Sequence, residues 1–238
     1  MSTQRTSSGT VAQPPRGRRR SGRPVGRGSQ LTSSPRMFQS DLLEFFSRVH
    51  PAVPVLIFGP AVAILAYSGL AETRSPLAAV GLLAGGYVFW TLCEYWIHRA
   101  IFHFEPERGI GARLHWIIHG VHHDYPNDPK RLVMPPAVSV PLAILFWLGF
   151  EGLLGRPAAY LFGAGFFGGY LLYDMIHYTV HHHRPRTRVM RLLRELHMRH
   201  HFQDATRGYG ISAPWWDVVF GTLPRRRGRA RAAGHARS

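Results

Sequence analysis

The chain has 238 residues, 45% of them hydrophobic and 18% charged, with a net charge of +16. The charges are segregated, because four stretches carry no Asp, Glu, Lys or Arg, namely residues 49–71, 75–93, 132–150 and 157–173. A membrane helix needs about 20 mostly apolar residues, so this pattern excludes an ordinary soluble globule. The aromatic content excludes a wholly disordered chain, and the single cysteine, Cys93, excludes a disulfide scaffold.

The first segment, residues 1–40, is rich in Arg, Ser, Gly and Pro and contains eight Arg before its first acidic residue. It lacks the apolar stretch of a secretory signal. Its composition predicts a disordered arm, and the tail at residues 224–238 has the same character. Such an arm can also bind DNA, but the membrane segments that follow favour a role at a membrane.

The folded domain is predicted to span residues 41–223. Within it, Pro51–Leu70 and Pro76–Ile97 form one predicted pair of membrane helices, and Val133–Leu154 and Ala158–Tyr178 form a second pair. The predicted fold class is therefore all-α. We expect an integral membrane protein with about four transmembrane helices and a cytoplasmic, histidine-rich helical cap.

The distribution of basic residues predicts the orientation in the membrane. The two short loops within the helix pairs carry only Arg74 and Arg156, and the other 27 basic residues lie on the opposite side. Cytoplasmic loops are enriched in Lys and Arg, so the basic side, including residues 98–131, is predicted to be cytoplasmic. Anionic lipids explain this positive charge, and no nucleic-acid partner is expected.

Thirteen of the 15 histidines lie where predicted membrane helices end on the cytoplasmic side. Residues three or four apart share a helix face, so closely spaced histidines are expected to present two or three imidazoles to one point. Imidazole suits iron, copper and zinc, and ten ligands are too many for one tetrahedral zinc. The sequence therefore predicts two metal ions of higher coordination number. The ten candidate ligands form four groups: His98 and His103; His119, His122 and His123; His177 and His181; His197, His200 and His201.

Histidines at a membrane interface can also be plain polar caps, which would explain one isolated pair but not four spaced groups. We expect His115, His182 and His183 to be secondary or incidental, and His50 and His235 to be surface residues.

Two acidic residues precede histidines at helical spacing. Glu94 lies four residues before His98, and Asp174 lies three residues before His177. A metal-bound histidine usually has its second nitrogen tied to a carboxylate or a carbonyl, so we expect Glu94 and Asp174 to orient these histidines. The alternative is that they pair with Arg or cap a helix end. Asp128, Asp204 and Asp217 are weaker candidates, for holding the cytoplasmic cap together.

Two further expectations concern packing and anchoring. The Gly- and Phe-rich stretch at residues 162–169 is expected to mediate close helix packing in preference to forming a slot for an acyl chain. Tyr209, Trp215 and Trp216 are a candidate interfacial anchor.

Beyond the histidines, the sequence resembles the membrane fatty acid hydroxylases of the sterol desaturase superfamily, specifically the fatty acid 2-hydroxylase branch. The resemblance runs from Glu94 to Leu223, over half of the chain. The string RLVMPP separates this branch from its sterol and alkane relatives. The strings that carry the resemblance are Glu94–Arg99 (EYWIHR), His119–His123 (HGVHH), Arg131–Pro136 (RLVMPP), Tyr173–Tyr178 (YDMIHY), His197–His201 (HMRHH) and Tyr209–Ser212 (YGIS).

This resemblance implies a dinuclear centre, with the ten histidines as ligands, that uses O2 to hydroxylate the carbon next to an acyl carboxyl group. Hydroxylation of a C–H bond needs a redox metal, and zinc has no accessible redox change. We therefore expect two iron ions, with zinc able to occupy the same sites in purified protein because it outcompetes Fe(II). No catalytic residue separate from the metal centre is predicted.

Animal and fungal members of the branch carry an N-terminal cytochrome b5 domain. Residues 1–41 are too few and too rich in Arg for one. The expected electron donor is therefore a separate protein, either cytochrome b5-like or a ferredoxin with its reductase, and the basic face could dock an acidic carrier.

The expected substrate is a lipid acyl chain that lies among the membrane helices, with membrane lipids as the other partner. Two alternatives are left open: a hydroxylase or desaturase of another lipid, of carotenoid or sterol type, and a non-catalytic membrane metal-binding protein. The excess of Arg over Lys is typical of a GC-rich genome and favours a bacterial inner membrane, with the endoplasmic reticulum as the eukaryotic alternative.

Overall fold

The computed structural model describes residue 31 and residues 33–225. The predictions for residues 1–30 and for the tail beyond residue 225 lie outside this part. The described residues form helices and no strand, which confirms the all-α class. In chain order the helices are α2 (Asp41–Phe46), α3 (Ala52–Glu72), α4 (Pro76–Trp96), η1 (Ile97–Phe102), α5 (Gly109–His115), η2 (Trp116–Gly120), α6 (Val121–Asp124), α7 (Pro136–Leu154), α8 (Ala158–His182), α9 (Arg188–Phe202) and α10 (Trp215–Val219).

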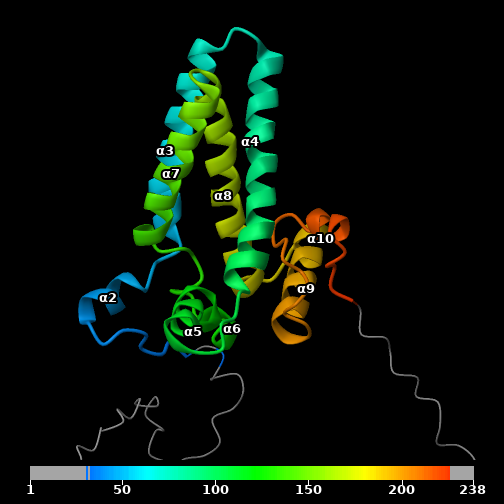
Figure 1. The fold of residues 1–238 in the computed structure, drawn as a ribbon. Coiled ribbons are helices and arrows are strands. Elements are labelled where there is room, and N and C mark those ends of the chain that lie inside the picture. The colour runs from blue at the N-terminus through cyan, green and yellow to red at the C-terminus, as the bar shows by residue number, and fades with distance from the viewer. Residues whose placement is uncertain (1–30, 32, 226–238) are drawn as a thin grey trace, which may run out of the picture.

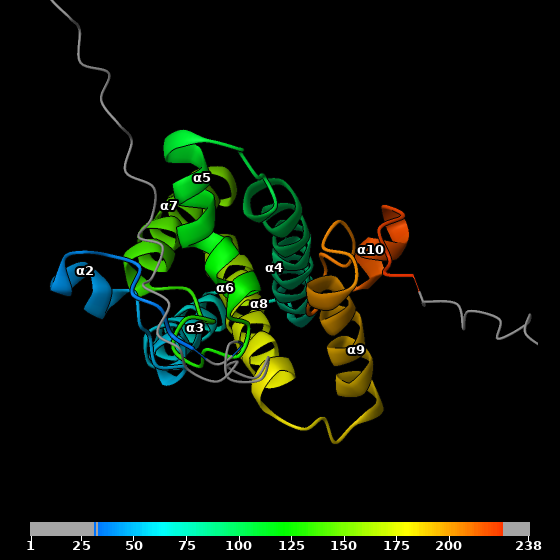
Figure 2. The same cartoon turned by 90° about the horizontal axis from the view of Figure 1, so that it is seen from below.

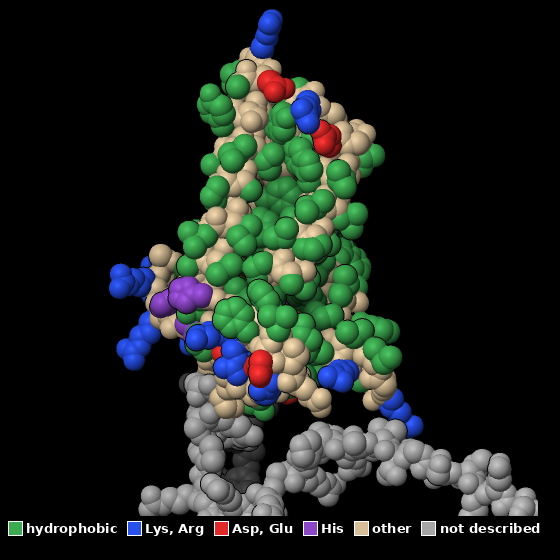
Figure 3. Space-filling view, turned by 90° about the vertical axis from the view of Figure 1, so that its left-hand side faces the viewer, with side chains coloured by type: hydrophobic (Ala, Val, Ile, Leu, Met, Phe, Trp, Pro, Cys, Tyr) green, Lys and Arg blue, Asp and Glu red, His purple; other side chains and the backbone are tan. Residues whose placement is uncertain are grey.

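The four long helices α3, α4, α7 and α8 stand side by side in an elongated bundle, and the short helices gather near one end of it (Figure 1). Seen from that end, α5 and α6 lie across the bundle while α9 and α10 flank α4 (Figure 2). Hydrophobic side chains cover the flank of the bundle, and charged side chains lie towards its two ends (Figure 3). This arrangement is typical of a protein whose long helices contact lipid.

Three helices of the described chain are long and apolar enough to cross a membrane: Ala52–Glu72, Pro76–Phe102 and Pro136–Leu154. The predicted fourth span lies in α8, which is a helix of 25 residues. Its last turns carry Asp174, His177 and His181, which lower its hydropathy. That α8 also crosses the membrane stays a prediction.

Close contact between α4 and α8 builds the centre of the bundle. A Cβ atom on Gly86 of α4 would collide with the backbone of Phe162, and one on Gly165 of α8 would collide with the backbone of Leu83. Small residues let membrane helices approach closely. The expectation that the glycines of residues 162–169 serve packing is thus confirmed at Gly165.

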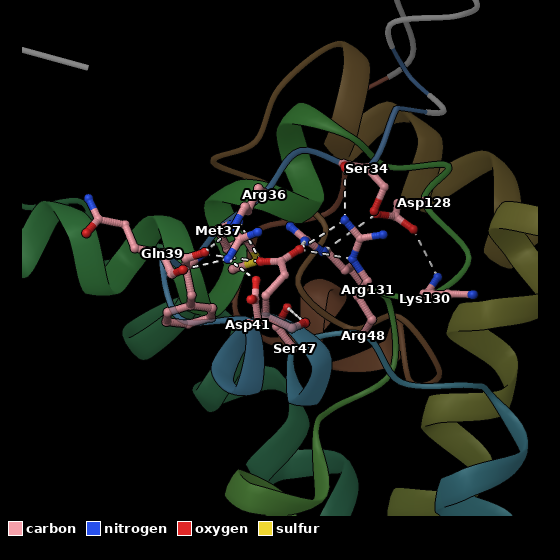
Figure 4. A network of polar contacts seen from close by, with 12 residues as sticks. Ser34, Arg36, Met37, Gln39, Asp41, Ser47, Arg48, Asp128, Lys130 and Arg131 are labelled. Carbon is pink, nitrogen blue, oxygen red and sulfur yellow. Dashed lines mark hydrogen bonds and ion pairs between the residues drawn. The ribbon is translucent and has the colours of Figure 1, made fainter. Parts of the chain in front are cut away.

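The segment before α2 belongs to the folded part of the chain. The backbone N–H groups of Met37 and Phe38 donate to Glu44 Oε2 at 2.8 and 3.2 Å, and Arg131 Nη2 donates to Glu44 Oε1 at 2.6 Å (Figure 4). Met37 and Phe38 are therefore held against α2, and the domain boundary at residue 40 stays a prediction. Composition averaged over the whole segment hides the few residues that dock.

Candidate metal centre

The ten predicted histidines come together in two sets of five. The sets lie where the ends of α4 and α8 meet the short helices, and the candidate ligand atoms of each set lie within 4.8 Å of one another. Group one consists of His98, His103, His119, His123 and His200, and group two consists of His122, His177, His181, His197 and His201.

The spacing of the imidazole nitrogens fits one metal ion per group. Neighbouring Nε2 atoms are 2.9 to 3.3 Å apart in group one and 2.8 to 3.2 Å apart in group two. Metal–nitrogen bonds of about 2.1 Å place neighbouring nitrogens about 3.0 Å apart at right angles, and about 3.4 Å apart at tetrahedral angles. Each group therefore fits an ion with more than four ligands, of the kind that imidazole binds.

Each histidine triple is divided between the two groups. His119 and His123 belong to group one, whereas His122, between them in sequence, belongs to group two. On α9 the same division separates His200 from the other two histidines of its triple. Successive residues of a helix are turned by about 100°, so adjacent histidines point to different ions. Each triple therefore presents two imidazoles to one point, within the two or three expected, and directs the third to the other group.

A π-helix brings His98 and His103 to the same group. The helix η1 (Ile97–Phe102) follows α4 directly, and the N–H of His103 donates to the carbonyl of His98 at 3.1 Å. Residues five apart diverge on an α-helix but align on this wider turn, which recurs at functional sites. The five-residue spacing was the signal in the sequence that α-helical reasoning missed.

Burial keeps the histidines neutral, which is the form that binds metal. It lowers the pKa of His123 to about 2 and that of His103 to about 3, with added repulsion from His200. Burial likewise lowers the pKa of His200 to about 4 and holds the pKa of His197 well below its usual range.

Backbone carbonyls orient two rings of group one. His98 Nδ1 lies 2.8 Å from the carbonyl oxygen of Tyr209, and His200 Nδ1 lies 2.8 Å from that of Arg207. A carbonyl oxygen can only accept a hydrogen bond, so Nδ1 carries the proton in both rings. The lone pair of Nε2 is then free for a metal.

Glu94, the expected partner of His98, makes no direct hydrogen bond to that ring among the described residues. Glu94 accepts hydrogen bonds from the N–H of Ser212, at 2.7 Å, and from the Ser212 hydroxyl. Its helix face is turned towards the loop after α9, where buried N–H groups need an acceptor. Glu94 and Tyr209 are thus connected through the backbone of that loop.

Asp174 likewise makes no direct hydrogen bond to His177 among the described residues. Asp174 accepts from the Tyr170 hydroxyl at 3.1 Å, and His177 Nδ1 has no hydrogen-bond partner among the described residues. Tyr170 lies one helical turn before Asp174. Its hydroxyl donates the hydrogen bond that we expected Asp174 to accept from His177.

The proposed anchor residues differ in exposure. Tyr209 is buried, which contradicts an anchoring role. Trp216 is half-buried and its Nε1 donates to Thr91 Oγ1 at 3.0 Å, so its anchoring role stays a prediction. Trp215 is 43% exposed, and its role at the interface stays a prediction. Within the described chain, His50, His115, His182 and His183 lie outside both histidine groups.

A cavity of about 270 Å³ opens beside the histidines. Histidines of both groups line it, namely His119, His122 and His177, and Phe46 of α2 forms part of its wall. The remaining lining is mostly apolar, including Leu132, Val133, Met134, Pro135, Ala137 and Val138. A hydrocarbon chain can therefore reach both groups.

Comparisons with known proteins agree with this site. The model of the fatty acid hydroxylase family matches residues 83–222. The chain is 39% identical over 193 residues to the dihydroceramide fatty acyl 2-hydroxylase FAH1 of Arabidopsis thaliana, covering 80% of both chains. It is 35% identical over 210 residues to the fatty acid 2-hydroxylase of Rattus norvegicus, covering 79% of this chain and 56% of the rat protein.

A solved structure shares the fold. It is that of full-length scs7p, in which only the hydroxylase domain is visible, with a TM-score of 0.73 and 35% identity. The alignment covers 77% of this chain and 70% of the solved one. The chain is therefore a membrane enzyme, an oxidoreductase, that belongs to the fatty acid hydroxylase family.

Proposed function

We propose that this enzyme inserts a hydroxyl group at the 2-position of a fatty acyl chain, using O2 and two iron ions. The observation that carries this proposal is the pair of five-histidine groups on one apolar cavity. The relatives named above support the position of attack, since their names are those of 2-hydroxylases.

The ten histidines would hold the metals. Iron in both groups would supply the redox chemistry for O2-dependent hydroxylation, which zinc cannot supply. The chain's own contribution is positional: burial keeps the imidazoles neutral, and the carbonyls of Tyr209 and Arg207 fix two rings. No other side chain is required to react.

The cavity would place the acyl chain. Its apolar walls favour hydrocarbon over water, and the histidines His119, His122 and His177 line it. A carbon of the chain that lies against these histidines is near both groups at once. The polar head of the lipid then lies at the membrane interface.

The orientation and the partners complete the proposal. Most basic residues of the described chain lie at the histidine end, and the positive-inside rule supports a cytoplasmic position for this end. The excess of Arg over Lys supports a bacterial inner membrane. Electrons would come from a separate cytochrome b5-like protein or ferredoxin. In a Cys93→Ser background, an impermeant thiol reagent added to intact cells should label Arg74→Cys and spare Arg108→Cys; the reverse pattern would invert the orientation.

The test of function is mass spectrometry of total fatty acids from cells that express the wild type or His122→Ala, grown with iron and a compatible reductase. We expect 2-hydroxy fatty acids with the wild type only. Hydroxylation at another carbon, or of a carotenoid or sterol, would contradict the acyl 2-position.

A further inference from the structure

The two histidine groups differ on the side of each ring that faces away from the metal. In group one, Nδ1 of His98 and of His200 is bonded to a backbone carbonyl. In group two, four buried Nδ1 atoms have no partner among the residues that the structure describes. These four belong to His177, His181, His197 and His201.

Two buried carboxylates hold the loop that carries those carbonyls, residues 207–213. Asp217 accepts from the N–H of Tyr209 at 2.9 Å through Oδ1 and from the N–H of Gly210 at 2.8 Å through Oδ2. Glu94 accepts from the N–H of Ser212 at 2.7 Å. Glu94 is 3% exposed and Asp217 is 1% exposed, so none of these three hydrogen bonds competes with water.

Asp217 also holds the first residues of the loop, indirectly through Thr222. The hydroxyl of Thr222 donates to Asp217 Oδ1 at 2.7 Å, and the N–H of Gly208 donates to the carbonyl of Thr222 at 2.9 Å. The Tyr95 hydroxyl lies 2.9 Å from the Thr222 hydroxyl. Asp217 therefore fixes the loop on both flanks of the Tyr209 carbonyl.

We propose that Glu94 and Asp217 are positioning residues for the metal of group one alone. They act through the loop, whose carbonyls at Tyr209 and Arg207 orient His98 and His200. Among the described residues, group two has no equivalent frame, so losing either carboxylate leaves its metal in place. The inference rests on the metal binding in the proposed function but not on the identity of the lipid.

The chemistry of the carboxylates predicts which substitutions matter. Asp217→Asn keeps the shape but turns an NH2 group towards an N–H donor of the loop. Glu94→Ala removes the acceptor for Ser212. Glu94→Gln keeps one oxygen for the Ser212 N–H and offers its NH2 group to the Ser212 hydroxyl, which can accept. This variant should therefore keep the metal affinity that Glu94→Ala loses.

Glu44→Gln is the matched control. Glu44 is also buried, at 9% exposure, and also accepts two backbone N–H groups, those of Met37 and Phe38. It lies beside Arg131 and, in the described hydrogen bonds, touches no histidine of either group.

The experiment is a titration of metal-free, full-length protein with Zn²⁺, with bound zinc measured per chain. We expect two tight sites in the wild type, in Glu94→Gln and in Glu44→Gln. In Asp217→Asn and Glu94→Ala we expect the zinc affinity of one site to be unchanged and that of the other to fall about 10–100-fold. Losses of this size are typical when a hydrogen-bond partner of a metal-bound histidine is removed.

A second variant identifies the weakened site. His197→Ala removes the central ligand of group two, so adding Asp217→Asn to it should leave no tight site. Two unchanged sites in Asp217→Asn, or equal weakening of both, would overturn the proposal. Wild-type protein that binds two zinc ions but makes no hydroxylated lipid would refute the proposed function and leave this inference standing.

Discussion

Histidines that are adjacent in sequence serve different ions in this arrangement. His122 and His123 belong to different groups, and so do His200 and His201. The helical turn of about 100° per residue separates them, which lets one short helix supply ligands to two metals. A single shift of helical register would therefore disturb both groups together.

The pair His181 and His182 makes this testable. His181 belongs to group two, whereas His182 lies outside both groups. We expect His181→Ala to lower hydroxylase activity by more than about 100-fold, because even the partners of metal-bound histidines cost about 10–100-fold. His182→Ala should keep at least half of the activity. Product formation per mole of protein is the measurement, and equal losses in both variants would contradict the assignment.

Among the secondary-structure elements, α2 closes one side of the cavity. Phe46 lines the cavity, and it is exposed, as are Leu42 and Phe45 on the same short helix. Glu44 fixes the helix by accepting from two backbone N–H groups and from Arg131. Burial alone would raise the pKa of Glu44, but these hydrogen bonds and the Arg131 charge lower it, so the carboxylate is ionised at neutral pH.

Removing this carboxylate should release α2. Taking one partner from a buried ion pair costs about 3–5 kcal/mol, and about 3 kcal/mol corresponds to roughly a 100-fold change in an opening equilibrium. We expect Glu44→Ala to speed hydrogen exchange at the amides of Met37 and Phe38 by about that factor. Asp41→Ala is the control, because Asp41 is exposed on the same helix. Unchanged exchange in Glu44→Ala would show that α2 is held by other contacts.

For the molecule as a whole, the long helices were readable from the sequence. The charge-free stretches and their bordering prolines predicted Pro76–Ile97 and Ala158–Tyr178, close to the observed α4 and α8. The ten histidines were also identified, since short-range spacing places them on common helices. The apolar stretches and the histidine spacing both depend on residues close in sequence, so they can be recognised without knowing the tertiary structure.

What the sequence did not predict depends on contacts between distant segments. Glu94 meets Ser212, and His98 meets Tyr209, more than 100 residues further along the chain. Nothing in the spacing of Glu94 and His98 indicates that both side chains would form hydrogen bonds with the same loop, far along the chain. The helical turn separates the members of each histidine triple, but which group each member joins depends on how the helices carrying them dock together.

The most direct measurement is anomalous X-ray diffraction at the iron edge from crystals of the iron-loaded enzyme. We predict two peaks, one within bonding distance of the Nε2 atoms of group one and the other within bonding distance of those of group two. A single peak shared by both groups, or a metal bound mainly by carboxylates such as Glu94 or Asp174, would contradict the two five-histidine centres.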